Sequence, residues 1–304
     1  MLLRVVLFYA NPTIECRFCL HIYMSVVVFF EKVAVFQILY PSLPMNSDKG
    51  KRYKIFFINL DKSVERRKEM ERQLERTGLP FERFYAIDGN AHSEEFFNGY
   101  YSANENAKKY YVSLSKSEIA CYISHLKVCE KILSENLDYG IVLEDDIVLK
   151  DSFLLVPSVL DSITNWNYIK LIAPFKKKKI ISSVPISIES CVAKAAGASK
   201  SGLENAEKFE LVRWKKPPAG TQAYAITKNG AKEFLEKRSR FFRPIDVDLQ
   251  HTWETKLDIQ GLIPSCCELA DIPSGISRKR RYHYPLARLV YKFKYALRSF
   301  VARF

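Results

Sequence analysis

The stretch YGIVLEDDIVL, residues 139–149, joins a short apolar run to three adjacent acidic residues, Glu144, Asp145 and Asp146. The apolar run has the length of a buried strand. Three adjacent carboxylates repel one another, and a hard divalent cation with oxygen ligands is their natural partner. Because residues i and i+2 share a face in extended backbone, we expect Glu144 and Asp146 to point together and bind the metal, with Asp145 turned toward another group of a ligand. A solvated acidic turn is the alternative interpretation.

A β-α unit precedes this stretch in the chain. Residues 53–60, YKIFFINL, predict a central strand, because their apolar residues are continuous rather than alternating. A charged helix follows, capped at Ser63 and terminated near Gly78, and residues 81–87, FERFYAI, predict the next strand. The unit therefore predicts two strands joined by a helix.

The alternation of helices and strands continues around the acidic triplet. Ser115 and Glu118 have the spacing of a capping box and predict a helix over 115–136. Residues 220–226, GTQAYAI, predict a strand followed by another helix, whereas the Lys- and Ser-rich residues 174–212 are interpreted as an irregular insertion. These elements predict an α/β fold with a mostly parallel sheet flanked by helices, in which ligands bind at the carboxyl ends of the strands.

Composition and missing motifs narrow the class of protein. A chain of 304 residues with 48% hydrophobic and 27% charged residues is globular. It contains no GxGxxG, GxxxxGK[ST], HExxH or GxSxG, which are the usual marks of dehydrogenases, P-loop enzymes, zincins and α/β-hydrolases. Seven cysteines without a regular framework favour a reducing compartment.

The positive charge is concentrated in the C-terminal tail. Residues 278–304 contain nine Lys or Arg and no acidic residue, which is +9 of the net +13. The tail also carries apolar residues at helical spacing: Leu286, Leu289, Val290, Phe293, Leu297, Phe300, Val301 and Phe304. This pattern predicts a basic amphipathic helix that lies on an anionic membrane surface. Packing against the rest of the protein is the alternative, and no nucleic-acid-binding motif accompanies the charge.

Three regions follow from these patterns. Residues 1–44 form an apolar N-terminal extension, residues 45–277 form the α/β domain, and residues 278–304 form the basic tail. The extension is interpreted as an over-extended reading of the start, with translation from Met45, or as a membrane anchor. If translation starts at Met45, the extension forms no part of the fold.

Four blocks give the chain a specific resemblance. IFFINLDKSVERR (55–67), FYAIDG (84–89), LSKSEIACYISHLKVCEKIL (114–133) and YGIVLEDDIVL (139–149) resemble, in this order, the blocks of glycosyltransferase family 25, the lipopolysaccharide and lipooligosaccharide glycosyltransferases. The likeness continues more weakly through residues 220–235 and 244–249.

This resemblance implies a GT-A-like enzyme that moves a hexose, galactose or glucose, from a UDP-sugar to a growing lipooligosaccharide or lipopolysaccharide chain with inversion. It also implies Mn²⁺ or Mg²⁺ bound by Glu144 and Asp146. A lipid-linked oligosaccharide acceptor would place the enzyme peripherally on the cytoplasmic face of the bacterial inner membrane. The alternatives are a collagen-type hydroxylysine galactosyltransferase and a non-catalytic protein that binds a nucleotide or an anionic lipid. No nucleic-acid partner is expected.

The candidate site residues have three roles. The resemblance implies that these residues line the donor pocket: Asn59, Leu60, Asp61, Arg66, Asp88, Glu118 and Asp145. The catalytic candidates, of which one takes the proton of the acceptor hydroxyl, are Asp246, Asp248 and His125. The acceptor candidates are Trp214, Thr221 and Tyr224. The alternatives are a helix N-cap for Asp246, a buried helix residue for His125, a surface ion pair for Arg66, and core packing for the two aromatic rings.

Overall fold

The computed structural model describes residues 51–172, 180–186, 208–255, 257–271 and 283–301. The chain divides into two compact units. One comprises Met45–Cys191 and Ala206–Phe304 and contains all described residues. The other comprises Met1–Pro44 and Val192–Asn205, so the prediction for residues 1–44 lies outside the described part of the chain.

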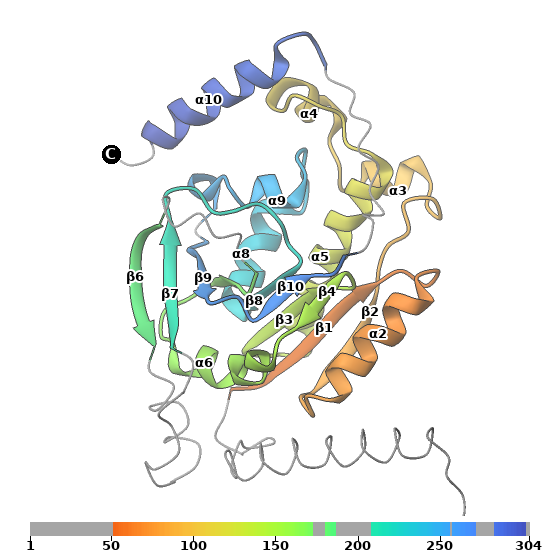
Figure 1. The fold of residues 1–304 in the computed structure, drawn as a ribbon. Coiled ribbons are helices and arrows are strands. Elements are labelled where there is room, and N and C mark those ends of the chain that lie inside the picture. The colour runs from red at the N-terminus through yellow and green to blue at the C-terminus, as the bar shows by residue number, and fades with distance from the viewer. Residues whose placement is uncertain (1–50, 173–179, 187–207, 256, 272–282, 302–304) are drawn as a thin grey trace, which may run out of the picture. The chain divides into compact units, whose positions relative to one another are not determined.

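An eight-stranded mixed sheet forms the centre of the described unit (Figure 1), in the order β2-β1-β3-β8-β5-β9-β7-β6. Its strands are β1 (Tyr53–Asn59), β2 (Phe81–Tyr85), β3 (Tyr139–Glu144), β5 (Tyr168–Lys170), β6 (Ile180–Ile186), β7 (Phe209–Trp214), β8 (Ala223–Thr227) and β9 (Ile259–Ile263). β1, β2 and β3 run parallel, as do β5 and β9, whereas β8 is antiparallel to both of its neighbours, β3 and β5. The predicted α/β fold is confirmed, with a sheet that is mixed at β8 and at the β7 edge.

Helices cover the sheet on both faces (Figure 1). The α-helices are α2 (Val64–Glu75), α3 (Glu94–Asn98), α4 (Ala103–Lys109), α5 (Lys116–Ser134), α6 (Val156–Ser162), α8 (Lys228–Arg238), α9 (Ile245–Asp248) and α10 (Ala287–Val301). Single 3₁₀ turns cover Asp151–Leu155 and Thr252–Glu254. The capping box of Ser115 and Glu118 begins α5 as predicted, and the Thr227 side chain caps α8. Ser63 occupies the N-cap of α2 but makes no side-chain hydrogen bond there.

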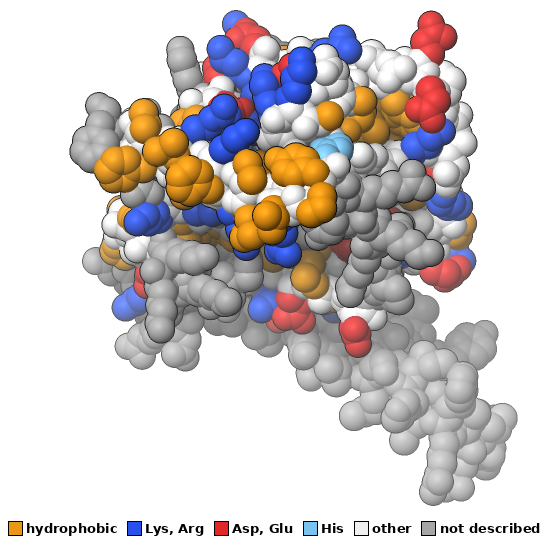
Figure 2. Space-filling model, turned by 90° about the horizontal axis from the view of Figure 1, so that it is seen from above, with side chains coloured by type: hydrophobic (Ala, Val, Ile, Leu, Met, Phe, Trp, Pro, Cys, Tyr) orange, Lys and Arg blue, Asp and Glu red, His pale blue; other side chains and the backbone are white. Residues whose placement is uncertain are grey.

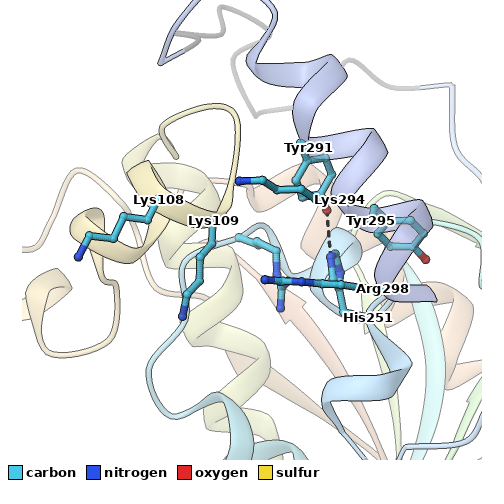
Figure 3. A pocket seen from close by; sticks show the side chains of 8 residues that line it. Lys108, Lys109, His251, Tyr291, Lys294, Tyr295 and Arg298 are labelled. Atoms are coloured by element: carbon cyan, nitrogen blue, oxygen red, sulfur yellow. Dashed lines mark hydrogen bonds between the residues drawn. The ribbon is translucent and has the colours of Figure 1, made fainter. Parts of the chain in front are cut away.

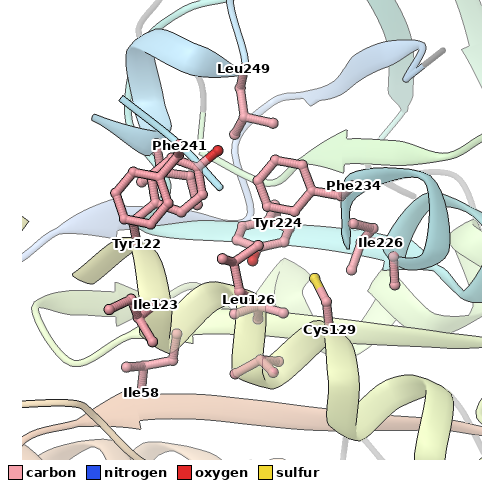
Figure 4. Close-up of a cluster of buried hydrophobic side chains, with 14 of the residues drawn as sticks. Ile58, Tyr122, Ile123, Leu126, Cys129, Tyr224, Ile226, Phe234, Phe241 and Leu249 are labelled. Carbon is pink, nitrogen blue, oxygen red and sulfur yellow. The ribbon is translucent and has the colours of Figure 1, made fainter. Parts of the chain in front are cut away.

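The alternation of side chains along β1 divides the core into two layers. Phe56 and Ile58 belong to a cluster with α5 and α8, shown in Figure 4, whereas Ile55 and Phe57 are buried toward the other face, where α2 packs on β1. Within the α5 layer the Tyr122 ring stacks on Phe241, with 3.8 Å between the ring centroids. A strand that is buried on both faces needs the continuous apolar sequence that β1 has.

The described residues within 174–212 lie almost entirely in strands and are not part of the irregular insertion that the sequence predicts; the rest of this range lies outside the described residues. Within this range β6 and part of β7 pair antiparallel and extend the sheet at one edge. The exposure of β6 explains the error, because residues 181–185 are all exposed and two adjacent serines, Ser182 and Ser183, interrupt its apolar residues. Its sequence therefore lacks the apolar run of a central strand.

The acidic triplet is fixed by a second, small sheet. β4 (Ile147–Leu149) pairs antiparallel with β10 (Cys267–Leu269), and the Ala270 amide donates to the Asp146 carbonyl oxygen at 2.8 Å. The Gln73 side chain of α2 bonds both the Ile147 carbonyl and the Leu149 amide. The backbone on both sides of Asp145 and Asp146 is thus held by neighbouring elements.

The C-terminal helix α10 presents its apolar residues to solvent. Tyr291 and Tyr295 are its inward contacts, since their hydroxyls bond His251 and the Gln250 carbonyl respectively. Figure 2, viewed from the α10 side, shows hydrophobic side chains gathered on an open surface beside Lys and Arg. The exposed apolar side chains are Leu286, Leu289, Val290, Phe293, Leu297, Phe300 and Val301. The predicted amphipathic helix is therefore present, and its apolar face does not pack on the described domain.

Candidate active site

The candidate site lies where several strands of the sheet end. Asn59 is the last residue of β1, Glu144 of β3 and Lys170 of β5, and these three strands run in the same direction. Because β8 runs the opposite way, it begins at this edge, and Thr221 lies just before it. The topology therefore brings side chains from distant parts of the sequence to one edge, which is where open α/β sheets bind ligands.

Glu144 is the centre of the buried side of this site. One of its oxygens, Oε1, accepts a hydrogen bond from the Thr221 hydroxyl at 2.6 Å and lies 3.6 Å from His125 Nε2. Burial alone would raise the pKa of Glu144, but His125, Thr221 and Lys170 together hold that pKa below its usual value. Glu144 is therefore a carboxylate at neutral pH.

His125 connects the site to the core. Its Nδ1 is 2.9 Å from the Tyr224 hydroxyl, and its Nε2 is buried without a hydrogen-bond partner in the described part of the chain. The residue is only 1% exposed and lies on α5, as expected for the buried helix histidine that was the alternative to a catalytic role. The unpaired Nε2 nevertheless faces Glu144 at the site, so His125 is both a buried helix residue and a member of the candidate site.

Asp145 pairs with two other residues predicted for the donor pocket. The Asn59 side-chain amide donates to Asp145 Oδ2 at 2.6 Å, and Arg66 Nη1 lies 3.1 Å from Oδ1. Arg66 is thus in a partly buried pair within the site, not in a surface ion pair. These contacts place a guanidinium and an amide beside the triplet, both on the Asp145 carboxylate.

Asp146 has a carboxylate oxygen that could bind a cation. Its Oδ1 is buried and has no hydrogen-bond partner among the described residues. Burial and then the negative charges of Glu144 and Asp145 raise the pKa of Asp146 to about 6. A cation bound at Oδ1 would offset both the cost of burying the charged carboxylate and its repulsion from Glu144 and Asp145. Asp146 therefore fits a divalent metal ion.

The pairing of Glu144 and Asp146 as metal ligands stays a prediction, but the strand geometry on which it rests needs a correction. β3 ends at Glu144, and Asp145 and Asp146 form a turn, so the alternation of an extended strand does not apply beyond Glu144. No group of three or more His, Cys, Asp and Glu residues arranged for a metal occurs in the described ranges. A metal here would use Asp146 and the oxygens of a bound substrate, as Mg²⁺ commonly does.

Asp246 lies within electrostatic reach of the same cluster. Its charge acts on Lys170 and on Cys121, and Glu144 acts on both of these groups as well. Asp246 is partly exposed and lies in the first turn of α9, where its Oδ1 accepts from the Val247 amide at 2.8 Å. Pro244 occupies the N-cap of α9, so Asp246 is not the helix cap of the alternative interpretation.

Asp248, the second carboxylate predicted as a base, is placed differently. It is 3% exposed and accepts from the Tyr122 hydroxyl at 2.5 Å and from Arg243 Nε at 2.7 Å. Arg238 Nε forms an ion pair with it at 2.6 Å. Because two hydrogen-bond donors and an ion-paired guanidinium surround its two oxygens, the structure gives Asp248 a role in the core and not as a proton acceptor.

Four of the predicted donor residues lie at the same edge without reaching the triplet. Asp61 pairs with Arg83, and Asp88 pairs with Lys62, both at 2.7 Å. Leu60 follows β1 and is partly exposed, and Glu118 bonds the Ser115 amide in the capping box. The structure thus assigns Glu118 a structural role at the start of α5.

The aromatic residues predicted for the acceptor are in the core. Tyr224 is 2% exposed and stacks on Tyr168, with 4.5 Å between the ring centroids. Trp214 is buried on β7 and packs over Gly261. Neither ring is presented to a sugar, which corrects the prediction. Thr221, the third acceptor candidate, lies at the site through its bond to Glu144.

Lys170 is a site residue that the sequence analysis missed. It is 2% exposed, and its ammonium donates to the Gly220 carbonyl. Burial lowers its pKa to about 8, although Asp246 and Glu144 act in the opposite direction. β5 has only three residues, too few for a strand signal, so no sequence pattern singles out the lysine at its end.

A mixed α/β sheet flanked by helices, with acidic and basic side chains at its carboxyl edge, is consistent with a GT-A-like fold. A comparison of sequences identifies the family. The pattern of glycosyltransferase family 25, described as an LPS biosynthesis protein family, matches residues 52–249, and the chain belongs to this family. Residues 52–249 include every predicted site residue, from Asn59 to Asp248.

Three relatives show the range of the similarity. A "Glycosyltransferase 25 family member" of Aedes aegypti is 33% identical over 42% of this chain and 22% of its own length. The "Lipooligosaccharide biosynthesis protein lic2B" of Haemophilus influenzae is 27% identical over 32% of this chain and 35% of its own. "Procollagen galactosyltransferase 2" of Mus musculus is 28% identical over 36% of this chain and 18% of its own. The matched stretch thus spans about a third or less of each relative.

Proposed function

We propose that the protein transfers galactose or glucose from a UDP-sugar to a growing lipooligosaccharide or lipopolysaccharide chain, with inversion at the anomeric carbon. The single observation that carries this proposal is the buried, unpaired oxygen of Asp146 beside the Asp145–Arg66 pair. A carboxylate that lacks a partner, next to a guanidinium, fits a divalent cation and the diphosphate that it accompanies. The lipooligosaccharide relative supports the choice of acceptor.

Asp246 is the proposed general base. It is a partly exposed carboxylate at the edge of the site, whereas Asp248 is enclosed by Arg238, Arg243 and Tyr122. In the proposed step Asp246 takes the proton of an acceptor hydroxyl, the hydroxyl oxygen bonds to the anomeric carbon, and UDP leaves from the opposite face. A positioned base of this kind contributes about 10²–10⁴ to the rate.

The other site residues are proposed to bind the metal ion and the phosphates and to orient the neighbouring side chains. Asp146 would hold a bound Mn²⁺ or Mg²⁺, which would supply Lewis-acid stabilisation of the departing diphosphate. Arg66 would add a guanidinium to the same phosphates or orient Asp145 toward the nucleoside. Lys170 faces Asp246 and Glu144 from inside the sheet, so its positive charge favours the ionised form of both carboxylates.

The α10 helix supports a peripheral position on an anionic membrane. Its Tyr291 and Tyr295 hold it to the domain, which leaves the apolar face and the flanking Lys and Arg side chains free for a lipid surface. No helix within the described residues is long and apolar enough to cross a bilayer. The described cysteines, Cys121, Cys129, Cys266 and Cys267, are free thiols, which favours a reducing compartment and the cytoplasmic face.

Calorimetric titration of the full chain with UDP, with and without Mn²⁺, tests the donor site without knowledge of the acceptor. We expect metal-dependent binding that Asp146→Ala abolishes. Glu130→Gln is the matched control, because Glu130 is an exposed carboxylate on α5 that pairs with Lys127 away from the triplet. UDP binding that is independent of the metal and of Asp146 would contradict the assignment. Absence of binding by a folded protein would refute the UDP-sugar proposal.

The acceptor is tested by transfer from UDP-galactose and UDP-glucose to truncated lipooligosaccharides and, in parallel, to a hydroxylysine peptide. Transfer to the peptide alone would favour the collagen-type alternative, to which the procollagen relative corresponds. Metal-dependent nucleotide binding with no transfer to either acceptor would favour a binding protein.

A further inference from the structure

A basic pocket lies beneath α10, separate from the candidate active site (Figure 3). Its lining residues are Lys108, Lys109, Arg243, His251, Tyr291, Lys294, Tyr295 and Arg298. They come from three parts of the chain: the end of α4, the segment around α9, and α10. Within the described residues, the lining contains five Lys or Arg side chains and no carboxylate.

The floor of this pocket is neutral and rigid. Arg243 is 2% exposed on its side chain and is paired with Asp248 and Glu254, so its charge is already balanced. Burial and the charge of Arg243 lower the pKa of His251 to about 3, which makes this ring neutral. Its Nδ1 therefore donates to the Val247 carbonyl at 2.9 Å, and its Nε2 accepts from the Tyr291 hydroxyl at 3.2 Å.

The rim of the pocket carries charge that the described protein does not neutralise. Lys294 and Arg298 have no carboxylate partner among the described residues, and Figure 3 shows both side chains reaching from α10 toward Lys109. Lys109 pairs with the exposed Glu105, and Lys108 points outward in the same view. Ammonium and guanidinium groups that converge on a concave surface are the donors that bind phosphate.

We infer that this pocket binds a phosphate group, with Lys294 and Arg298 as its principal ligands. The apolar face of α10 places the pocket beside any lipid surface that the helix contacts, so a phosphate-bearing lipid headgroup is one source of the group and a free phosphate is the other. This inference goes beyond the proposed glycosyl transfer and does not depend on it, because none of the eight lining residues belongs to the donor or base assignments.

The experiment compares two double variants of the full chain that remove equal charge from the same helix. Lys294→Ala with Arg298→Ala removes the rim of the pocket. Arg288→Ala with Lys292→Ala removes one Arg and one Lys from the opposite flank of α10, where both residues are exposed and neither lines the pocket. General attraction to an anionic surface falls equally in the two variants, whereas a phosphate site is lost in only one. Circular dichroism and thermal melting check that both variants retain α10.

Two probes distinguish the sources of the phosphate. Binding is measured to phosphatidylcholine vesicles that contain phosphatidic acid, and separately to inorganic phosphate in solution. If the site takes a lipid headgroup, the pocket variant should lose vesicle affinity by about tenfold more than the flank variant. If it takes free phosphate, the wild type should bind the soluble ion and only the pocket variant should lose that binding.

Equal loss of vesicle binding in the two variants, together with no phosphate binding that depends on Lys294 and Arg298, would overturn the inference. UDP binding is measured on the same samples. The pocket variant should retain it, so failure of the phosphate site and failure of the donor site give different results.

Discussion

Replacement of Asp248 by asparagine separates a structural carboxylate from a catalytic one. The substitution keeps the size of the side chain but removes the charge that Arg243 and Arg238 share in the core. Loss of one partner from a buried ion pair costs about 3–5 kcal/mol. We expect the lower end, about 3 kcal/mol, because Glu254 remains as a partner of both arginines and its side chain is 24% exposed. For a domain of this size, that loss lowers the melting temperature by about 6–12 °C.

The matched variant is Asp246→Asn, two residues earlier on the same short helix. Because Asp246 is partly exposed, whereas Asp248 is buried among arginines, the free energy of unfolding should change by less than about 1 kcal/mol. Its transfer rate should fall about 10²–10⁴-fold. Urea denaturation and single-turnover transfer are measured on both proteins below their melting temperatures. A stable Asp248→Asn protein without activity, together with an active Asp246→Asn protein, would reverse the two assignments.

Three further outcomes follow from contacts outside the site. Gly261→Ala should lower the free energy of unfolding by about 1–3 kcal/mol, because a Cβ there would lie 2.2 Å from the Trp214 ring; urea denaturation measures it, and an unchanged midpoint would show that Trp214 moves freely. Burial would raise the pKa of Glu254, but Arg243 and its neighbours hold that pKa at about 2, below the usual 4.5, so its contribution to stability is complete above pH 4.5 and is lost as the pH falls toward 2. The urea midpoints of wild type and Glu254→Gln should therefore differ at pH 7 and approach each other at pH 3; a constant gap would contradict the pairing. Phe293→Glu should leave the melting temperature unchanged, since the ring is 71% exposed, and should reduce sedimentation with anionic vesicles; equal sedimentation would argue against α10 as the membrane contact.

The sequence predicts the first half of the fold well because its signals are local. β1 and β3 are continuous apolar runs, and α5 begins with a capping box whose two hydrogen bonds are both present. The edge strand β6 was missed because an exposed strand needs no apolar run, and its pairing partner β7 is distant in the chain. The central strand β5 was missed because three residues are too few to show a period.

The candidate site is only partly predictable for a related reason. Asn59, Arg66 and Asp145 were expected in one pocket, and Asn59 and Arg66 both contact Asp145. The two neighbouring carboxylates of α9 could not be ranked, because only the tertiary structure places Asp248 among arginines and leaves Asp246 at the edge. The aromatic character of Tyr224 and Trp214 does not indicate what surrounds each ring, and both rings are in the core.

If α10 lies on a membrane as proposed, its attachment to the domain would hold the candidate site at a fixed height above the lipid. Tyr291 bonds His251, and His251 lies three residues after Asp248, at the end of the segment that carries the proposed base. The Tyr291 ring also packs on the Tyr110 ring, with 5.1 Å between the ring centroids, and the negative charge of Asp246 acts on Tyr110. With the apolar face of α10 in lipid, this connection would set the distance between Asp246 and the lipid surface. Glycolipids with too short an oligosaccharide would not reach Asp246. Glycolipids of the right length would present their terminal hydroxyl to it. Chain length of the acceptor would then be read by the geometry of the tail and not by the sugar pocket alone.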